Sequence, residues 1–151
     1  MDTSVPEPPS RKGDAPGPPF RVLVVDDNRD IADSTAQLLT IVGFDARACY
    51  DGQAALAAAD AFRPGVCFLD LNMPGMGGEE LAVRLRAGAG GRPLVLVAVT
   101  AMSSPEYRER TAAAGFDLHL VKPVDPYQLV EVVDTLFRAC SPAGASAVAR
   151  Q

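Results

Sequence analysis

The segment V-C-F-L-D-L-N-M-P-G-M-G-G, from Val66 to Gly78, constrains the fold of this chain more than any other. Four apolar residues lead directly into Asp70, and a loop rich in proline and glycine follows at once. A short, continuous apolar run bounded by turn residues is typical of a strand that is buried on both faces. We therefore predict that Asp70 lies at the carboxyl end of a buried strand.

From Arg21 onward, apolar runs of this kind alternate with amphipathic segments. Such alternation predicts βα repeats, in which helices cover both faces of a parallel sheet. The predicted strands are 22–25, 44–49, 66–69, 94–99 and 118–121, with 94–99, the most apolar run, as the buried centre. The predicted helices are about 31–42, 51–62, 79–86, 104–115 and 125–137, with a linker over 88–93.

Several helix ends are marked by capping residues. Asp51 and Ser104 are predicted N-caps, because a short side chain with an oxygen can accept a free N–H of the first helical turn. Gly43 and Gly115 are predicted to follow the last turns of their helices, where a positive φ is common.

Composition narrows the function. The 151 residues suit one domain, and the net charge of -5 without a block of Lys or Arg favours neither nucleic acid nor a membrane surface as a partner. Cys49, Cys67 and Cys140 are odd in number and widely spaced, which disfavours a disulfide framework and a zinc site. Because no signal-like leader or long apolar segment is present, we expect a soluble, cytoplasmic protein.

We expect three parts along the chain. Residues 1–19 are rich in proline, glycine and charge and are predicted to be a disordered tail. Residues 20–138 form the folded domain, and 139–151, with little to pack, form a flexible C-terminal tail.

Four of the five predicted strands end in residues chemically unlike the run before them: Asp26 and Asp27, Asp70, Thr100, and Lys122. The carboxyl ends of parallel strands share one edge of the sheet, which is where such sheets bind ligands. Turn or capping chemistry would explain any one of these residues, but it does not explain why all of them stand at the ends of strands. We therefore predict that these side chains meet in space.

Three crowded carboxylates repel one another, so they either take up protons or bind a cation. Oxygen ligands without His or Cys suit Mg2+. We expect Asp26 and Asp27 to form the main metal shell, with Asp70 as a further ligand. Adding Lys122 and Thr100 makes a clamp for a phosphoryl group, with Asp70 as the nucleophile that carries it as an acyl phosphate.

The motifs V-V-D-D-N, L-D-L-N-M-P-G-M-G-G, V-T-A and V-K-P-V resemble, in this order, the receiver domain of two-component response regulators, over roughly Arg21 to Phe137. The resemblance implies an α/β, flavodoxin-like fold: a doubly wound, five-stranded parallel sheet with strand order 2-1-3-4-5. It also implies that Asp70 accepts a phosphoryl group, with Mg2+, from the phosphohistidine of a sensor histidine kinase or a histidine phosphotransfer protein.

The resemblance further assigns roles to neighbouring residues. Asn72 lies where the family supplies a backbone carbonyl to the metal. Thr100 matches the hydroxyl that turns toward the phosphoryl group, and Ala101 the small residue that leaves access to it. Met102 and Asn72 flank the route of an attacking water, and Pro123 falls where such domains often hold a cis peptide bond.

One position departs from the family. Three residues before Lys122, where Tyr or Phe is common and moves with the threonine, this chain has His119. Two interpretations remain open: a half-buried structural residue, or a switch whose imidazole swings in the same way and adds pH sensitivity.

Few residues follow Phe137, so we expect a stand-alone regulator without an output domain. It would signal by phosphorylation-dependent binding of a downstream protein through the surface of 104–138. A phosphorelay intermediate and a receiver cut from a hybrid histidine kinase are alternatives, and the initial Met1 argues mildly against the second.

A different class is a Mg2+-dependent phosphatase with an aspartyl nucleophile, of the haloacid-dehalogenase type. Such enzymes use a second Asp two residues after the first as general acid, and Asn72 stands there. No glycine-rich nucleotide loop follows the first predicted strand. We therefore expect no catalysis beyond self-phosphorylation and autodephosphorylation at Asp70.

Overall fold

The structure is a computed structural model that describes residues 20–140. The tails predicted over 1–19 and beyond 140 lie outside the described residues. Residues 139 and 140, assigned above to the flexible tail, belong to the last helix.

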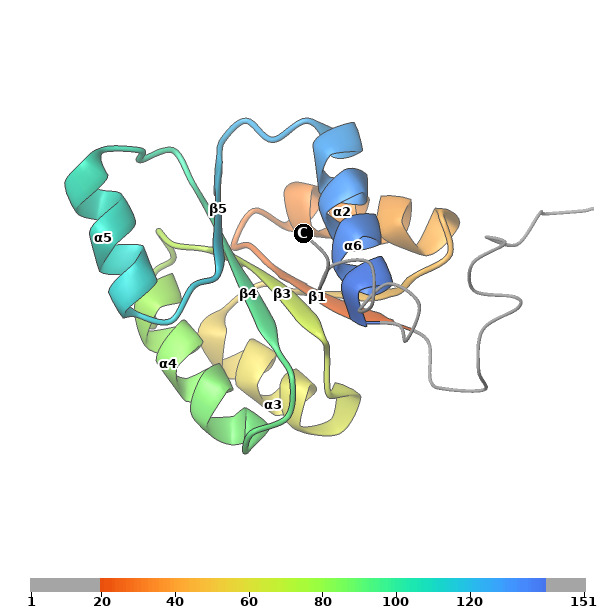
Figure 1. Ribbon diagram of the computed structural model, residues 1–151, viewed down its shortest axis with the longest axis horizontal. Coiled ribbons are helices and arrows are strands. Elements are labelled where there is room, and N and C mark those ends of the chain that lie inside the picture. Colours follow the sequence, from red (N-terminus) through yellow and green to blue (C-terminus); the bar gives the residue numbers. More distant parts are fainter. Residues whose placement is uncertain (1–19, 141–151) are drawn as a thin grey trace, which may run out of the picture.

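Five parallel strands form one sheet in the order β2-β1-β3-β4-β5, so the predicted fold class and strand order are confirmed (Figure 1). The strands are β1 (Arg21–Val25), β2 (Asp45–Cys49), β3 (Val66–Asp70), β4 (Val95–Thr100) and β5 (Leu118–Val121). The prediction that 94–99 is the centre of the sheet is wrong. The central strand is β3, and all five of its residues are buried.

The helices are α2 (Arg29–Ile41), α3 (Gly52–Phe62), α4 (Gly78–Ala89), α5 (Pro105–Ala113) and α6 (Pro126–Cys140). On one face of the sheet, α2 and α6 pack over alternate strand residues such as Val24 and Phe68. On the other face, α3, α4 and α5 pack over the intervening residues, such as Leu69 and Leu96 (Figure 1). Burial on both faces explains why the strands read as continuous apolar runs.

The capping predictions agree with the structure. Asp51 and Ser104 cap α3 and α5, accepting the N–H groups of Ala54 and Tyr107. Gly43 and Gly115 follow α2 and α5 with φ of 110° and 105°.

One helix end differs from the prediction and one agrees with it. Helix α4 continues through Gly88 into the predicted linker and ends before Gly90, whose φ is 59°. Helix α3 ends at Phe62, as predicted, and the residue that follows it, Arg63, has a positive φ of 53°.

The strand register determines what meets at the carboxyl edge. Val25 pairs with Leu69 across β1 and β3, so the next residues, Asp26 and Asp70, lie at the same level. Thr100 pairs with Val121 across β4 and β5, which brings Lys122 to the same edge.

The thiols of Cys49 and Cys67 are free and buried, and burial raises the pKa of Cys67 to about 12. Among residues 20–140, no helix is both long and apolar enough to cross a bilayer.

Candidate functional site

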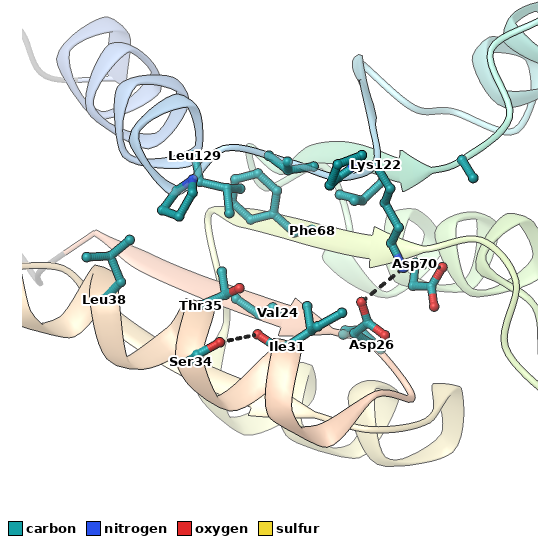
Figure 2. Close-up of a pocket in the computed structure, with 16 residues that line it drawn as sticks. Val24, Asp26, Ile31, Ser34, Thr35, Leu38, Phe68, Asp70, Lys122 and Leu129 are labelled. Carbon is teal, nitrogen blue, oxygen red and sulfur yellow. Dashed lines mark hydrogen bonds and ion pairs between the residues drawn. The ribbon is translucent and has the colours of Figure 1, made fainter.

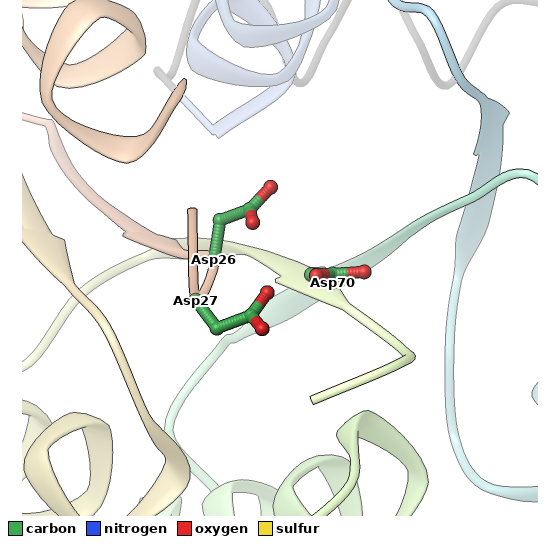
Figure 3. Close-up of side chains that lie close together, drawn as sticks. All are labelled: Asp26, Asp27 and Asp70. Atoms are coloured by element: carbon green, nitrogen blue, oxygen red, sulfur yellow. The ribbon is translucent and has the colours of Figure 1, made fainter. Parts of the chain in front are cut away.

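Asp26, Asp27 and Asp70 point into one shared space at the carboxyl edge (Figure 3). One carboxylate oxygen from each lies within 4.8 Å of the others. Asp26 and Asp70 are buried, with 4% and 5% of their surfaces exposed, whereas Asp27 is exposed. The predicted convergence of these residues is therefore present in the structure.

Backbone N–H groups orient the two buried carboxylates. Asp26 Oδ1 accepts from the N–H of Asn28 at 2.9 Å, and Asp70 Oδ1 accepts from the N–H of Asn72 at 3.3 Å. Asn28 in turn caps α2 by accepting the N–H of Ile31. These local turns hold both carboxylates at the mouth of the sheet.

Lys122 closes the cluster from the end of β5. Its Nζ lies 3.3 Å from Asp26 Oδ2 and 3.4 Å from Asp70 Oδ1, and 29% of its side chain is exposed. Burial alone would lower the pKa of this amine, but the negative charges of Asp70 and Asp26 outweigh it and raise the pKa. The side chain of Lys122 is therefore positively charged at neutral pH. The peptide bond between Lys122 and Pro123 is cis.

The pKa of Asp70 is raised from 3.8 to about 6. Burial is the largest cause and the charge of Asp26 the next, while Lys122 and the N–H of Asn72 act in the opposite direction. The single positive charge of Lys122 thus does not neutralise the three carboxylates. A divalent cation would restore the balance, and a donor set made only of oxygen fits Mg2+.

Thr100 is not directed into this cluster. Its buried hydroxyl accepts the N–H of Met102 at 3.1 Å, and it does not line the cavity at the carboxylates. Ala101 does line that cavity, together with Asn72. The turning of Thr100 toward a phosphoryl group therefore remains an implication of the resemblance.

His119 is partly buried, and its ring lies between α5 and the loop that follows β4. Nε2 is 3.0 Å from the carbonyl oxygen of Met102, and Nδ1 is 3.4 Å from Oγ1 of Thr111. The residue is thus anchored on both sides.

Two cavities that share lining residues mark the site. The first, about 430 Å³, is bounded by the three carboxylates together with Asn28, Ile31, Asn72, Ala101 and Lys122. The second, about 680 Å³, runs between α2 and α6 and shares Asp26, Asp70 and Lys122 with the first (Figure 2). Its walls are mostly apolar, including Phe68 and Leu129 (Figure 2).

Two supporting residues of the site were not predicted from the sequence. Asn28 could have been recognised as an N-cap, because it directly precedes the amphipathic α2. At Gly78 an added Cβ would lie 2.7 Å from the Asp70 carbonyl oxygen and 2.8 Å from the Leu71 Cα. That close approach depends on the path of the loop between Leu71 and Gly78, which its proline and glycines do not specify by themselves.

Comparison with known proteins agrees with this geometry. The family model for the response regulator receiver domain matches residues 22–134. The chain is 38% identical over 118 residues to the transcriptional regulatory protein PrrA of Mycobacterium tuberculosis, covering 78% of this chain and 50% of PrrA. It is 33% identical over 121 residues to an uncharacterized 14.6 kDa protein of Leptolyngbya boryana, covering 80% of this chain and 92% of that protein.

Among solved structures, the chemotaxis protein CheY4 of Vibrio cholerae has 30% sequence identity and a TM-score of 0.72, covering 78% of this chain and 98% of CheY4. The chain spans about half the length of PrrA and of the DNA-binding response regulator MtrA of Mycobacterium leprae, of which it covers 51%. Since the family model spans most of the described residues, the chain belongs to the family of response regulator receiver domains.

Proposed function

We propose that this chain accepts a phosphoryl group on Asp70 from the phosphohistidine of a sensor histidine kinase or a histidine phosphotransfer protein. The observation that carries the proposal is a buried aspartate contacted by a lysine and crowded by two further carboxylates. In the transfer, a carboxylate oxygen of Asp70 forms the new bond to phosphorus while the phosphorus–nitrogen bond breaks. The bonding electrons go to the donor imidazole, which leaves as neutral imidazole because its other ring nitrogen carries a proton.

The neighbouring side chains would stabilise the charge that moves. Asp26, Asp27 and Asp70, with the Asn72 carbonyl oxygen, would hold Mg2+, and the ion would supply positive charge to the phosphoryl oxygens. Lys122 already contacts Asp70 and would pair with one phosphoryl oxygen. To donate a hydrogen bond to the phosphoryl group, the Thr100 hydroxyl would have to turn away from the Met102 N–H.

Hydrolysis of the acyl phosphate would end the signal. Water would approach through the cavity lined by Ala101 and Asn72, and Met102, which is half exposed in the loop after β4, would flank that route. We propose no separate enzymatic activity beyond this self-phosphorylation and autodephosphorylation.

The proposed output is binding of a downstream protein through the surface of 104–138. This surface exposes the apolar side chains of Leu118, Val121 and Tyr127.

A second candidate function is a phosphorelay, in which the phosphoryl group passes onward from Asp70. The exclusion of nucleic acid rests on the charge of the chain alone, and MtrA, a relative of which this chain covers 51%, is named a DNA-binding regulator.

The test uses acetyl phosphate with Mg2+ and intact-mass spectrometry. We expect one phosphoryl group on the wild type, labile to base, and none on Asp70→Asn. Asp60→Asn, the same change at an exposed acid of α3, should label like the wild type. A label that persists on Asp70→Asn would reject the assignment. Turnover of p-nitrophenyl phosphate faster than the protein's own dephosphorylation would favour the phosphatase alternative.

A further inference from the structure

A small cavity opens between α3 and α4, which lie side by side on one face of the sheet (Figure 1). Its volume is about 110 Å³, which is room for about four water molecules at about 30 Å³ each. The cavity has an apolar, buried floor and a charged rim. The floor includes Pro64, Leu85, Ala89 and Leu94, and the rim consists of Asp60, Arg63, Arg84 and Arg92.

The charges on the rim do not balance within residues 20–140. Arg84 is paired with Glu80, with 2.9 Å between Nη2 and Oε2. Among the described residues, neither Arg63 nor Arg92 has a carboxylate partner, and Asp60 has no basic partner. Once the pair of Arg84 and Glu80 is set aside, two arginines face one aspartate. The rim therefore keeps one net positive charge.

Arg63 differs from the other arginines at this end of the sheet. Arg21, Arg86 and Arg92 each donate to a backbone carbonyl oxygen. The guanidinium of Arg63 makes no hydrogen bond, ion pair or ring contact within the described part of the chain. No contact of its charged group within this part of the fold therefore explains the side chain at this position.

The backbone of Arg63 strengthens this observation. Its φ of 53° lies in the left-handed region, and within residues 20–140 Arg63 is the one residue other than glycine with a positive φ. Glycine adopts this conformation at no steric cost, whereas a side chain with a Cβ is disfavoured there. An arginine that is both disfavoured by its backbone and unpaired indicates a role toward a group outside the fold.

We propose that this cavity binds a small monocarboxylate with a short apolar tail. The guanidinium groups of Arg63 and Arg92 hold the carboxylate, because their N–H groups match its two oxygens. One negative charge neutralises the net charge of the rim, and the tail lies on the floor beside Leu85 and Leu94. A phosphate dianion matches this charge less well, and a cavity of this volume does not hold a nucleotide-sized ligand.

This site is separate from the phosphoryl chemistry proposed for Asp70. The cavity shares no lining residue with the two cavities at the carboxylates. Its rim residues come from α3, from α4 and from the connections that lead into β3 and β4. A bound carboxylate therefore links α3 to α4 and stabilises the folded state.

The ligand class is tested by amide NMR of the whole chain, titrated with sodium butyrate, acetate, phosphate or chloride at constant ionic strength. We expect butyrate to shift the amides of cavity residues such as Gly88 and Leu94. It should bind about tenfold more tightly than acetate, because it buries two more CH2 groups. Phosphate or chloride that binds as tightly as butyrate overturns the carboxylate assignment. Shifts centred on Asp70, or no butyrate binding, overturn the site.

The role of Arg63 is tested with Arg63→Gly, which removes the guanidinium and relieves the backbone. We expect its unfolding midpoint to rise by about 2 °C, while its affinity for butyrate falls at least about fivefold. Lost binding in a more stable protein cannot come from unfolding. Arg108→Ala, a change at an exposed arginine of α5, should bind butyrate like the wild type. Wild-type affinity in Arg63→Gly, or in Arg63→Asn if the glycine variant does not fold, overturns the proposal.

Discussion

The two edges of the sheet differ in how completely their charged side chains are paired. At the amino edge, Arg86 from α4 donates to the carbonyl oxygens of Leu94 and Gly115 and to Asp117 Oδ2. The same Oδ2 accepts the N–H of Leu96 at 2.9 Å. At the carboxyl edge, one lysine faces three carboxylates.

The difference shows how this fold divides stability from function. Arg86 satisfies backbone groups where β4, α4 and α5 meet, so that edge stabilises the folded state. At the carboxyl edge, burial and the charge of Asp26 make ionisation of Asp70 unfavourable. That unfavourable charge is what a metal ion and a phosphoryl group can relieve.

The largest expected effect is at the amino edge. Arg86→Ala should lower the free energy of unfolding by about 2–3 kcal/mol, because two carbonyl oxygens and Asp117 lose their donor. Arg84→Ala is the matched control, since the ion pair of Arg84 with Glu80 is exposed, and its loss should cost less than about 0.5 kcal/mol. Urea unfolding measures both. Equal losses would show that the amino edge is not a stabilising centre.

Two glycines of α4 sharpen the comparison. Gly78→Ala places a Cβ against the backbone of Asp70 and Leu71, so we expect a loss of about 2 kcal/mol and slower labelling by acetyl phosphate. Gly88→Ala meets nothing within 4 Å and should be neutral or stabilise by about 0.5 kcal/mol. Thermal unfolding and labelling rates measure these effects. Normal labelling in Gly78→Ala would show that the loop tolerates displacement.

Asp70→Asn should stabilise the metal-free protein at neutral pH by about 1–2 kcal/mol, because it removes a buried charge. The folded pKa, about 6, lies above the ordinary 3.8, so the neutral carboxyl is the form that the fold favours. The wild type therefore loses stability as pH rises through about 6, and the advantage of Asp70→Asn should disappear below about pH 4. Unfolding midpoints across pH test this. An advantage that does not change with pH would reject the charge explanation.

Mg2+ should raise the thermal stability of the wild type by about 1.4 kcal/mol at ten times its dissociation constant, and EDTA should reverse the gain. The gain should grow between about pH 5 and 7 as Asp70 ionises, and should shrink in Asp27→Asn. Asp60→Asn, remote from the cluster, should respond like the wild type. A gain equal in all variants would place the ion elsewhere.

Much of the fold could be predicted because the signals are local. Asp51 and Ser104 are N-caps in sequence and in structure, and β5 has the predicted bounds. The centre of the sheet could not be read from apolar content, because β3 and β4 are both deeply buried and only the crossover order distinguishes them. The length of α4 was underestimated because Gly88 resembles a helix end, although it lies within the helix.

The candidate site divides in the same way. The meeting of Asp26, Asp27, Asp70 and Lys122 follows from parallel strands that end on one edge, which periodicity alone predicts. The contacts of the His119 ring and the direction of the Thr100 hydroxyl could not be predicted, because they depend on the path of the loop after β4.

The sequence by itself determined which residues reach the carboxyl edge, since the alternation of strands and helices repeats along the chain and requires no distant contact. Only the tertiary structure decided how those residues are charged and held. Burial, the lysine contacts and the hydrogen bonds of His119 arise between segments that are far apart in the chain, and their strength depends on distances of a few ångströms that no local pattern encodes.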